Sequence, residues 1–136
     1  MSRGNVIIVD DDYITVENLE KYLEIRGFSV ATVDTIEEAL ETLRGAAFDV
    51  IFVDIMLPPG DIFTIEETRD GRYTGLKFLE LIHMRKAVFN ISDSTKIFMI
   101  TNWREEPQVE SFSKQFGFKI LNKPLEISTI DRILEI

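Results

Sequence analysis

The sequence predicts one α/β domain in which helices cover both faces of a five-stranded parallel sheet. Its 136 residues fit a single domain. Short apolar runs alternate with helical patterns along the whole chain, and this alternation is typical of parallel sheets with helical crossovers. Hydrophobic residues make up 45% of the chain and charged residues 29%, which is enough for a packed core and a polar surface. Right-handed crossovers then favour a doubly wound sheet. If the expected strand order is 2-1-3-4-5, strands one, three, four and five lie side by side.

The first half of the chain predicts three strands and two helices. The strands are expected at residues 6–9, 28–33 and 48–53, because each is a short run rich in β-branched or aromatic side chains. A first helix is predicted to end at Gly27, since it carries an apolar stripe made of Val16, Leu19 and Leu23. Residues 35–38 read TIEE, a capping-box pattern that predicts a second helix through Gly45.

The second half predicts two strands and three helices. The strands are expected at residues 96–100 and 119–122. One helix should follow Gly75, a second should end at Gly117, and a third should lie near the end of the chain. Their apolar stripes are Leu76, Leu79 and Ile82; Val109, Phe112 and Phe116; and Ile127, Ile130, Ile133 and Leu134.

One segment interrupts this rhythm. Residues 59–74 read PGDIFTIEETRDGRYT, with neither a helical nor a strand spacing of apolar residues. We therefore expect a long loop inserted after the third strand. Loops longer than about 12–15 residues are uncommon in compact domains, and they are usually functional or disordered.

Composition and charge exclude several classes of function. The net charge of −9 and the isoelectric point near 4.6 argue against direct DNA binding and against an anionic membrane surface. The absence of cysteine excludes disulfides and thiolate metal sites. No signal peptide is recognisable, and the apolar runs are too short to span a bilayer. We expect a cytoplasmic protein.

Polar side chains follow four of the predicted strands at the point where each strand ends. In open α/β sheets, ligands bind beyond the carboxyl ends of the strands, near the switch point of the topology. With the expected strand order, these residues would share one cleft. They are Asp10, Asp11 and Asp12 after the first strand, Asp54 after the third, Thr101 and Asn102 after the fourth, and Lys123 and Pro124 after the fifth.

The chemistry that needs this set is phosphoryl transfer to a carboxylate. Clustered carboxylates repel one another, so a hard divalent cation such as Mg²⁺ is required to keep them ionised. Transfer spreads negative charge over three phosphoryl oxygens, which the metal, the Lys123 ammonium and the Thr101 hydroxyl could each stabilise. Asp54 would then be the nucleophile that forms an acyl phosphate.

At these residues the sequence resembles a known family. The segments VIIVDDD, FVDIMLP, MITN and NKP are similar to the motifs of response-regulator receiver domains in two-component signal transduction. The resemblance runs through the whole chain in the same order. It implies a flavodoxin-like receiver fold over residues 1–136, with an insertion at 59–74 and no output domain in this chain.

The same resemblance implies a role for each site residue. Asp54 matches the phosphoacceptor, Thr101 the hydroxyl that follows the phosphoryl group, and Lys123 the phosphate-binding lysine, with a cis bond before Pro124. The Mg²⁺ ligands would be Asp11, Asp54 and the backbone carbonyl of Met56, with Asp10 acting mainly through water.

The implied function is signalling by a stand-alone receiver. The phosphoryl donor would be a histidine kinase or a phosphotransfer protein, and the partner downstream would be a target protein. No enzyme activity is expected beyond self-catalysed phosphoryl transfer and dephosphorylation. The chain departs from the family pattern in its insertion and at Ile120, where family members often carry a switching Tyr or Phe.

Two other functions remain open at this point. A receiver-like interaction module that takes no phosphate is favoured by Ile120 and by the insertion. A phosphatase of the haloacid dehalogenase type would use Asp10 as nucleophile in a D-x-D motif, although that family expects Thr or Val where this chain has Ile14. Among single residues, Asp12 is interpreted as a helix N-cap, His83 as a packed or surface histidine, and Trp103 as an aromatic that overhangs the cleft.

Overall fold

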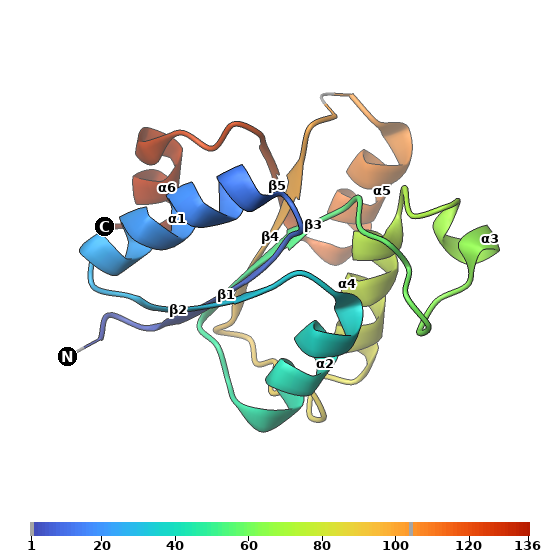
Figure 1. Ribbon diagram of the computed structural model, residues 1–136, viewed down its shortest axis with the longest axis horizontal. Helices are drawn as coiled ribbons and strands as arrows, with labels where there is room; N and C mark the ends of the chain where they lie inside the picture. Colours follow the sequence, from blue (N-terminus) through green and yellow to red (C-terminus); the bar gives the residue numbers. More distant parts are fainter. Residues whose placement is uncertain (1, 104) are drawn as a thin grey trace.

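The computed structural model describes residues 2–103 and 105–136. Its centre is a parallel sheet of five strands in the order β2-β1-β3-β4-β5, as the sequence predicts (Figure 1). The strands are β1 (Asn5–Val9), β2 (Ser29–Val33), β3 (Val50–Asp54), β4 (Lys96–Thr101) and β5 (Lys119–Asn122).

Helices cover both faces of this sheet. On one face lie α1 (Tyr13–Ile25) and α6 (Ile127–Leu134), and on the other lie α2 (Ile36–Gly45), α4 (Thr74–Met84) and α5 (Pro107–Phe116) (Figure 1). Alternate residues of β1 point to opposite faces, so Ile7 joins the core under α2 and α4 while Ile8 joins the core under α1. Both are fully buried. This is why β1 reads as a continuous apolar run.

Helix α1 begins at the residue that the sequence interprets as its cap. The Asp12 side chain accepts a hydrogen bond from the Thr15 backbone N–H at 3.4 Å and from the Thr15 hydroxyl at 2.8 Å. The N-cap interpretation of Asp12 is therefore confirmed. Helix α2 begins in the same way, since Thr35 accepts the Glu38 N–H at 3.2 Å.

The predicted insertion after β3 is present, but it is not a loop throughout, and it ends before residue 74. The segment contains a short helix, α3 (Ile65–Thr68), and Thr74 is already the first residue of α4. A complete capping box starts α3: Glu67 N donates to Thr64 Oγ1 at 3.0 Å, and Thr64 N donates to a Glu67 carboxylate oxygen at 2.9 Å. The TIEE pattern occurs here a second time, but no amphipathic run follows it, and this hid the helix. The inserted segment therefore comprises residues 59–73.

The inserted segment is folded back against the domain. Thr68 is fully buried, and its hydroxyl accepts the Gly71 N–H and donates to the Thr64 carbonyl. Three consecutive residues then take left-handed conformations, with φ of 51° at Arg69, 57° at Asp70 and 87° at Gly71. These turn the chain towards α4. Only the glycine adopts such a conformation without a steric penalty.

The start of α4 is pressed against the end of β3. A Cβ at Gly75 would lie 2.3 Å from the Asp54 carbonyl oxygen, so only glycine fits there. Gly75 N also donates a hydrogen bond to the Ile55 carbonyl at 2.8 Å. The inserted segment ends just before α4, so this contact holds the end of the segment beside Asp54. Within the described residues, no helix combines the length and the apolar character needed to cross a membrane.

Candidate functional site

The carboxyl ends of four strands bring the polar residues of the site together. Strand pairing places Val9 beside Val53 and Asp54 beside Ile100, so β1, β3 and β4 end at the same edge. Asp10 follows β1 directly, and Asp54 is the last residue of β3. Carboxylate oxygens of Asp10, Asp11 and Asp54 lie within 4.8 Å of one another. The predicted acidic cluster therefore exists.

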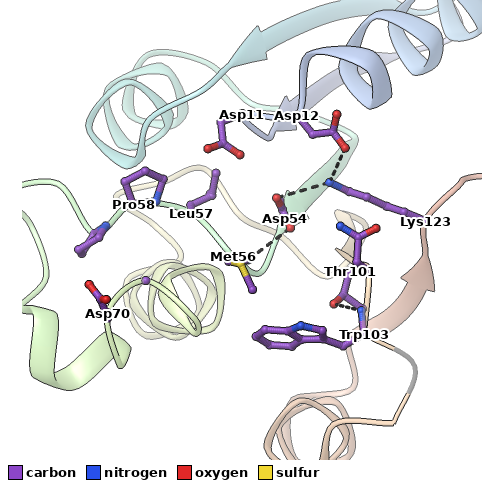
Figure 2. Close-up of a pocket in the computed structure, with 13 residues that line it drawn as sticks. Asp11, Asp12, Asp54, Met56, Leu57, Pro58, Asp70, Thr101, Trp103 and Lys123 are labelled. Atoms are coloured by element: carbon purple, nitrogen blue, oxygen red, sulfur yellow. Dashed lines mark hydrogen bonds and ion pairs between the residues drawn. The ribbon is translucent and has the colours of Figure 1, made fainter.

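The Lys123 ammonium lies among three of the carboxylates, and Figure 2 shows its contacts with Asp12 and Asp54. Its Nζ is 3.0 Å from Asp10 Oδ2, 3.2 Å from Asp12 Oδ2 and 3.5 Å from Asp54 Oδ2. The contact with Asp10 is an ion pair without hydrogen-bond geometry, and Asp10 Oδ2 accepts no hydrogen bond from the described residues. Lys123 is followed by a cis peptide bond to Pro124, as the resemblance implies. Asp12 therefore contacts Lys123 in addition to capping α1.

The electrostatics of the cluster favour a cation. Burial, followed by the charge of Asp10, raises the pKa of Asp54 to about 7. The same two causes raise the pKa of Asp11. Burial alone would lower the pKa of Lys123, but its contacts with Asp10 and Asp54 raise it. One ammonium therefore leaves the carboxylates with excess negative charge.

The donor set fits a hard divalent cation. The available atoms are carboxylate oxygens, and one of them, Asp10 Oδ2, is shielded from solvent, pairs with Lys123 Nζ and accepts no hydrogen bond from the described residues. Mg²⁺ takes oxygen ligands and keeps several waters, so one or two carboxylates suffice to bind it. Asp11 lies at the exposed rim and Asp54 at the floor, where both can reach the same ion (Figure 2).

Thr101 ends β4 beside Lys123 and is held by the loop that follows it. Its Oγ1 accepts the Trp103 backbone N–H at 3.0 Å, while its own proton has no acceptor among the described residues. Asn122 Nδ2 donates to the Trp103 carbonyl at 2.6 Å. The side chain of Trp103 lines the cavity beside Asp54, so the prediction that it overhangs the cleft is confirmed (Figure 2).

A cavity of about 500 Å³ opens beside the Asp54 carboxylate. One wall carries Asp11, Asp12, Thr101 and Lys123, and the opposite wall comes from the segment that follows Asp54. Met56 is 47% exposed there, and its backbone N–H donates to Asp54 Oδ1 at 3.3 Å. Residues that complete this wall are Leu57, Pro58, Pro59, Asp70 and Gly71.

Sequence reasoning missed part of this site. Asp70 and Gly71 of the inserted segment line the cavity, and Asp12 contacts Lys123. The Asp-Gly pair at 70–71 does signal a turn, but nothing in the sequence shows that this turn faces the third strand. His83 packs edge-on against Phe116, with ring centroids 5.0 Å apart, away from the cavity lining.

Comparison with known proteins supports the resemblance. The sequence model of one family, described as the response regulator receiver domain, matches residues 6–135. The hybrid signal transduction histidine kinase L of Dictyostelium discoideum is 26% identical over 135 residues, which are 97% of this chain and 7% of that protein. A cyclic di-GMP phosphodiesterase of Thermotoga maritima is 26% identical over 125 residues, which are 92% of this chain and 28% of that protein.

Solved structures share the fold. The chemotaxis protein CheY4 of Vibrio cholerae superposes with a TM-score of 0.73 at 26% identity, over 97% of this chain and 96% of that one. A receiver domain from Methylobacillus flagellatus gives a TM-score of 0.72 at 20% identity, over 98% of both chains. The chain thus matches whole receiver structures, but it spans under a third of the two curated relatives above.

Proposed function

This chain belongs to the response regulator receiver domain family of two-component signalling, and on that premise we propose that it accepts a phosphoryl group on Asp54 with the help of Mg²⁺. The observation that carries the proposal is the position of the Asp54 carboxylate. It lines a cavity of about 500 Å³, 3.5 Å from the Lys123 ammonium and within 4.8 Å of the Asp10 and Asp11 carboxylates. Residues 1–136 would form one receiver unit.

In the proposed reaction, an Asp54 carboxylate oxygen attacks the phosphorus of a phosphohistidine. The new P–O bond forms as the P–N bond to the imidazole breaks, and the imidazole leaves with the bonding electron pair and takes up a proton. The donor would be a histidine kinase or a phosphotransfer protein. Bound Mg²⁺, held by Asp11, Asp54 and the Met56 carbonyl with Asp10 acting through water, would neutralise charge on the phosphoryl oxygens.

Lys123 and Thr101 would stabilise the remaining charge. The Lys123 ammonium already touches Asp54, so a small movement brings it to a phosphoryl oxygen. The Thr101 hydroxyl can donate to a second oxygen because its proton is not used by Trp103. The charge of Lys123 lowers the pKa of Asp54, but burial and the charge of Asp10 outweigh it. At a pKa of about 7, part of the metal-free population stays protonated at neutral pH.

The structure offers little support for a phosphatase that uses Asp10 as its nucleophile. Asp10 is 2% exposed and lies against Lys123, whereas Asp54 lines the cavity that Thr101 and Lys123 also line. A nucleophile must reach the phosphorus of its substrate, and the cavity gives that access to Asp54. We therefore place any turnover by this chain at the Asp54 acyl phosphate.

Intact mass spectrometry tests the proposal. After incubation with phosphoramidate and Mg²⁺, the protein should gain the mass of one phosphoryl group, and EDTA should prevent the gain. Asp54→Asn should take up none, while Asp93→Asn, at an exposed carboxylate, should behave as the parent. An unlabelled parent would favour a receiver-like interaction module instead. Label that persists in Asp54→Asn would place the acceptor elsewhere.

A further inference from the structure

The inserted segment grips the loop after β4 through three side chains, here called the clasp: Arg72, Tyr73 and Trp103. The Tyr73 and Trp103 rings meet edge to face, with centroids 5.9 Å apart. The Arg72 guanidinium carbon lies 5.1 Å from the Trp103 ring centroid and 5.9 Å from that of Tyr73. Both distances are within the range of a cation–π contact. The clasp thus joins two segments that both line the Asp54 cavity.

A fourth group reinforces the clasp. Tyr73 is 8% exposed, and its interaction with the Glu106 carboxylate raises the pKa of its hydroxyl. Glu106 caps α5 through Oε1, which accepts the Gln108 N–H at 3.0 Å. Its Oε2 is shielded from solvent and accepts no hydrogen bond from the described residues, so the Tyr73 hydroxyl lies near the Glu106 carboxylate without a hydrogen bond to this oxygen. The start of α5 therefore lies close to the inserted segment.

One residue of the clasp, Trp103, is hydrogen-bonded to a residue of the proposed phosphorylation site. Trp103 donates its backbone N–H to Thr101 Oγ1, the hydroxyl proposed to follow the phosphoryl group. If Thr101 turns towards a phosphoryl group on Asp54, this hydrogen bond breaks and Trp103 loses an anchor. Ile120 on β5 has no ring that could respond, so the aromatic groups coupled to Thr101 are those of the clasp.

We propose that Arg72 and Tyr73 are positioning residues that hold Trp103, and through it the Thr101 hydroxyl, so that phosphorylation of Asp54 and the conformation of residues 59–73 control one another. This inference rests on the proposed function. Its physical basis is a shared residue: Trp103 donates its backbone N–H to Thr101 Oγ1, and the clasp holds the ring of the same residue, so loss of either contact leaves Trp103 less firmly held. Coupling of this kind is reciprocal: a change at Asp54 or Thr101 must alter the conformation of residues 59–73, and a change in that segment must alter the site.

Hydrogen exchange of residues 59–72 tests one direction of the coupling. In the parent, phosphorylation with phosphoramidate and Mg²⁺ should speed exchange in this segment about fivefold or more, given the usual strength of one aromatic pair and one cation–π contact. Tyr73→Ala should exchange fast from the start and show no further response. Tyr73→Phe, which keeps the ring, should respond. Ile65→Ala, at a 61% exposed side chain of the same segment, is the matched control.

The other direction needs no phosphoryl group. Thr101→Ala removes the acceptor of the Trp103 N–H and should speed exchange of residues 59–72, whereas Thr101→Ser should restore the parent rate. Unchanged exchange in Thr101→Ala would overturn the inference, and so would a parent-like phosphorylation response in Tyr73→Ala. Intact mass measured on the same samples separates the two proposals. If the parent takes up no label, the proposed function is refuted. Hydrogen exchange in the Thr101 variants would then test the coupling between Thr101 and the clasp without it.

Discussion

Replacing Asp54 by Asn should stabilise the metal-free protein at alkaline pH, although it removes the proposed phosphoacceptor. In the folded chain, burial and the charge of Asp10 raise the pKa of Asp54 to about 7 from an ordinary value of 3.8. The ionised carboxylate is therefore less stable in the folded protein than in the unfolded chain. Asparagine has nearly the same shape and carries no charge, so it removes this cost.

The size and sign of the effect follow from proton linkage. Between pH 4 and pH 7 the folded state binds more protons at this site than the unfolded state, so stability falls as pH rises through this window. Above pH 7 the full cost is present, about 4 kcal/mol at ~1.36 kcal/mol per pH unit. The titration of Asp54 is coupled to its charged neighbours Asp10 and Lys123, which can adjust when the Asp54 charge is removed. We therefore expect Asp54→Asn to recover about half of the 4 kcal/mol. Asp54→Asn should gain about 2 kcal/mol at pH 8 and about 1 kcal/mol at pH 5.

Urea unfolding in EDTA at the two pH values measures this difference directly. The midpoint should rise in Asp54→Asn at pH 8 with an unchanged slope, and the gain should shrink at pH 5. Asp93→Asn serves as the control, because its side chain is exposed. A gain that is the same at both pH values, or a loss of stability at pH 8, would refute the electrostatic reasoning. A loss of stability at pH 8 would show instead that the ion pair with Lys123 outweighs the cost of burial.

Three further results are expected. Mg²⁺ should raise the melting temperature of the parent by mass action, and Asp11→Asn should abolish most of that rise; an undiminished rise in the variant would place the ion elsewhere. Gly75→Ala should lower the free energy of unfolding in urea by about 2 kcal/mol or more, because its Cβ would meet the Asp54 carbonyl oxygen. The control Gly45→Ala, whose Cβ would have no atom within 4 Å, should be neutral or stabilising. Equal effects of the two variants would contradict the packing argument. Replacing residues 60–72 by a short Gly-containing turn should keep a cooperative fold and change the dephosphorylation rate, measured by mass spectrometry; a parent-like rate would remove the segment from the chemistry.

The sequence by itself determined the layout of the sheet and the principal residues of the site. Apolar runs of strand length mark strands buried on both faces, and helical stripes mark their crossovers, so the order of elements follows from local pattern. The strand order followed from the resemblance to receiver domains, and it is confirmed. Parallel strands end at one edge, and the residues just after them must therefore meet. For this reason Asp10, Asp11, Asp54 and Lys123 could be placed in one cleft before any coordinates were known.

Only the tertiary structure decided how the inserted segment sits and what it touches. Its short helix has a capping box but no apolar stripe, so its position depends on contacts with distant residues, such as the pairing of Tyr73 with Trp103. Which carboxylates pair with Lys123 depends on distances of a few ångströms between residues that follow different strands. No spacing in the sequence encodes these distances. Local pattern specifies strands and helices because their periodicity is a property of neighbouring residues. The contacts of an irregular segment are set by the shape of the surface on which it packs.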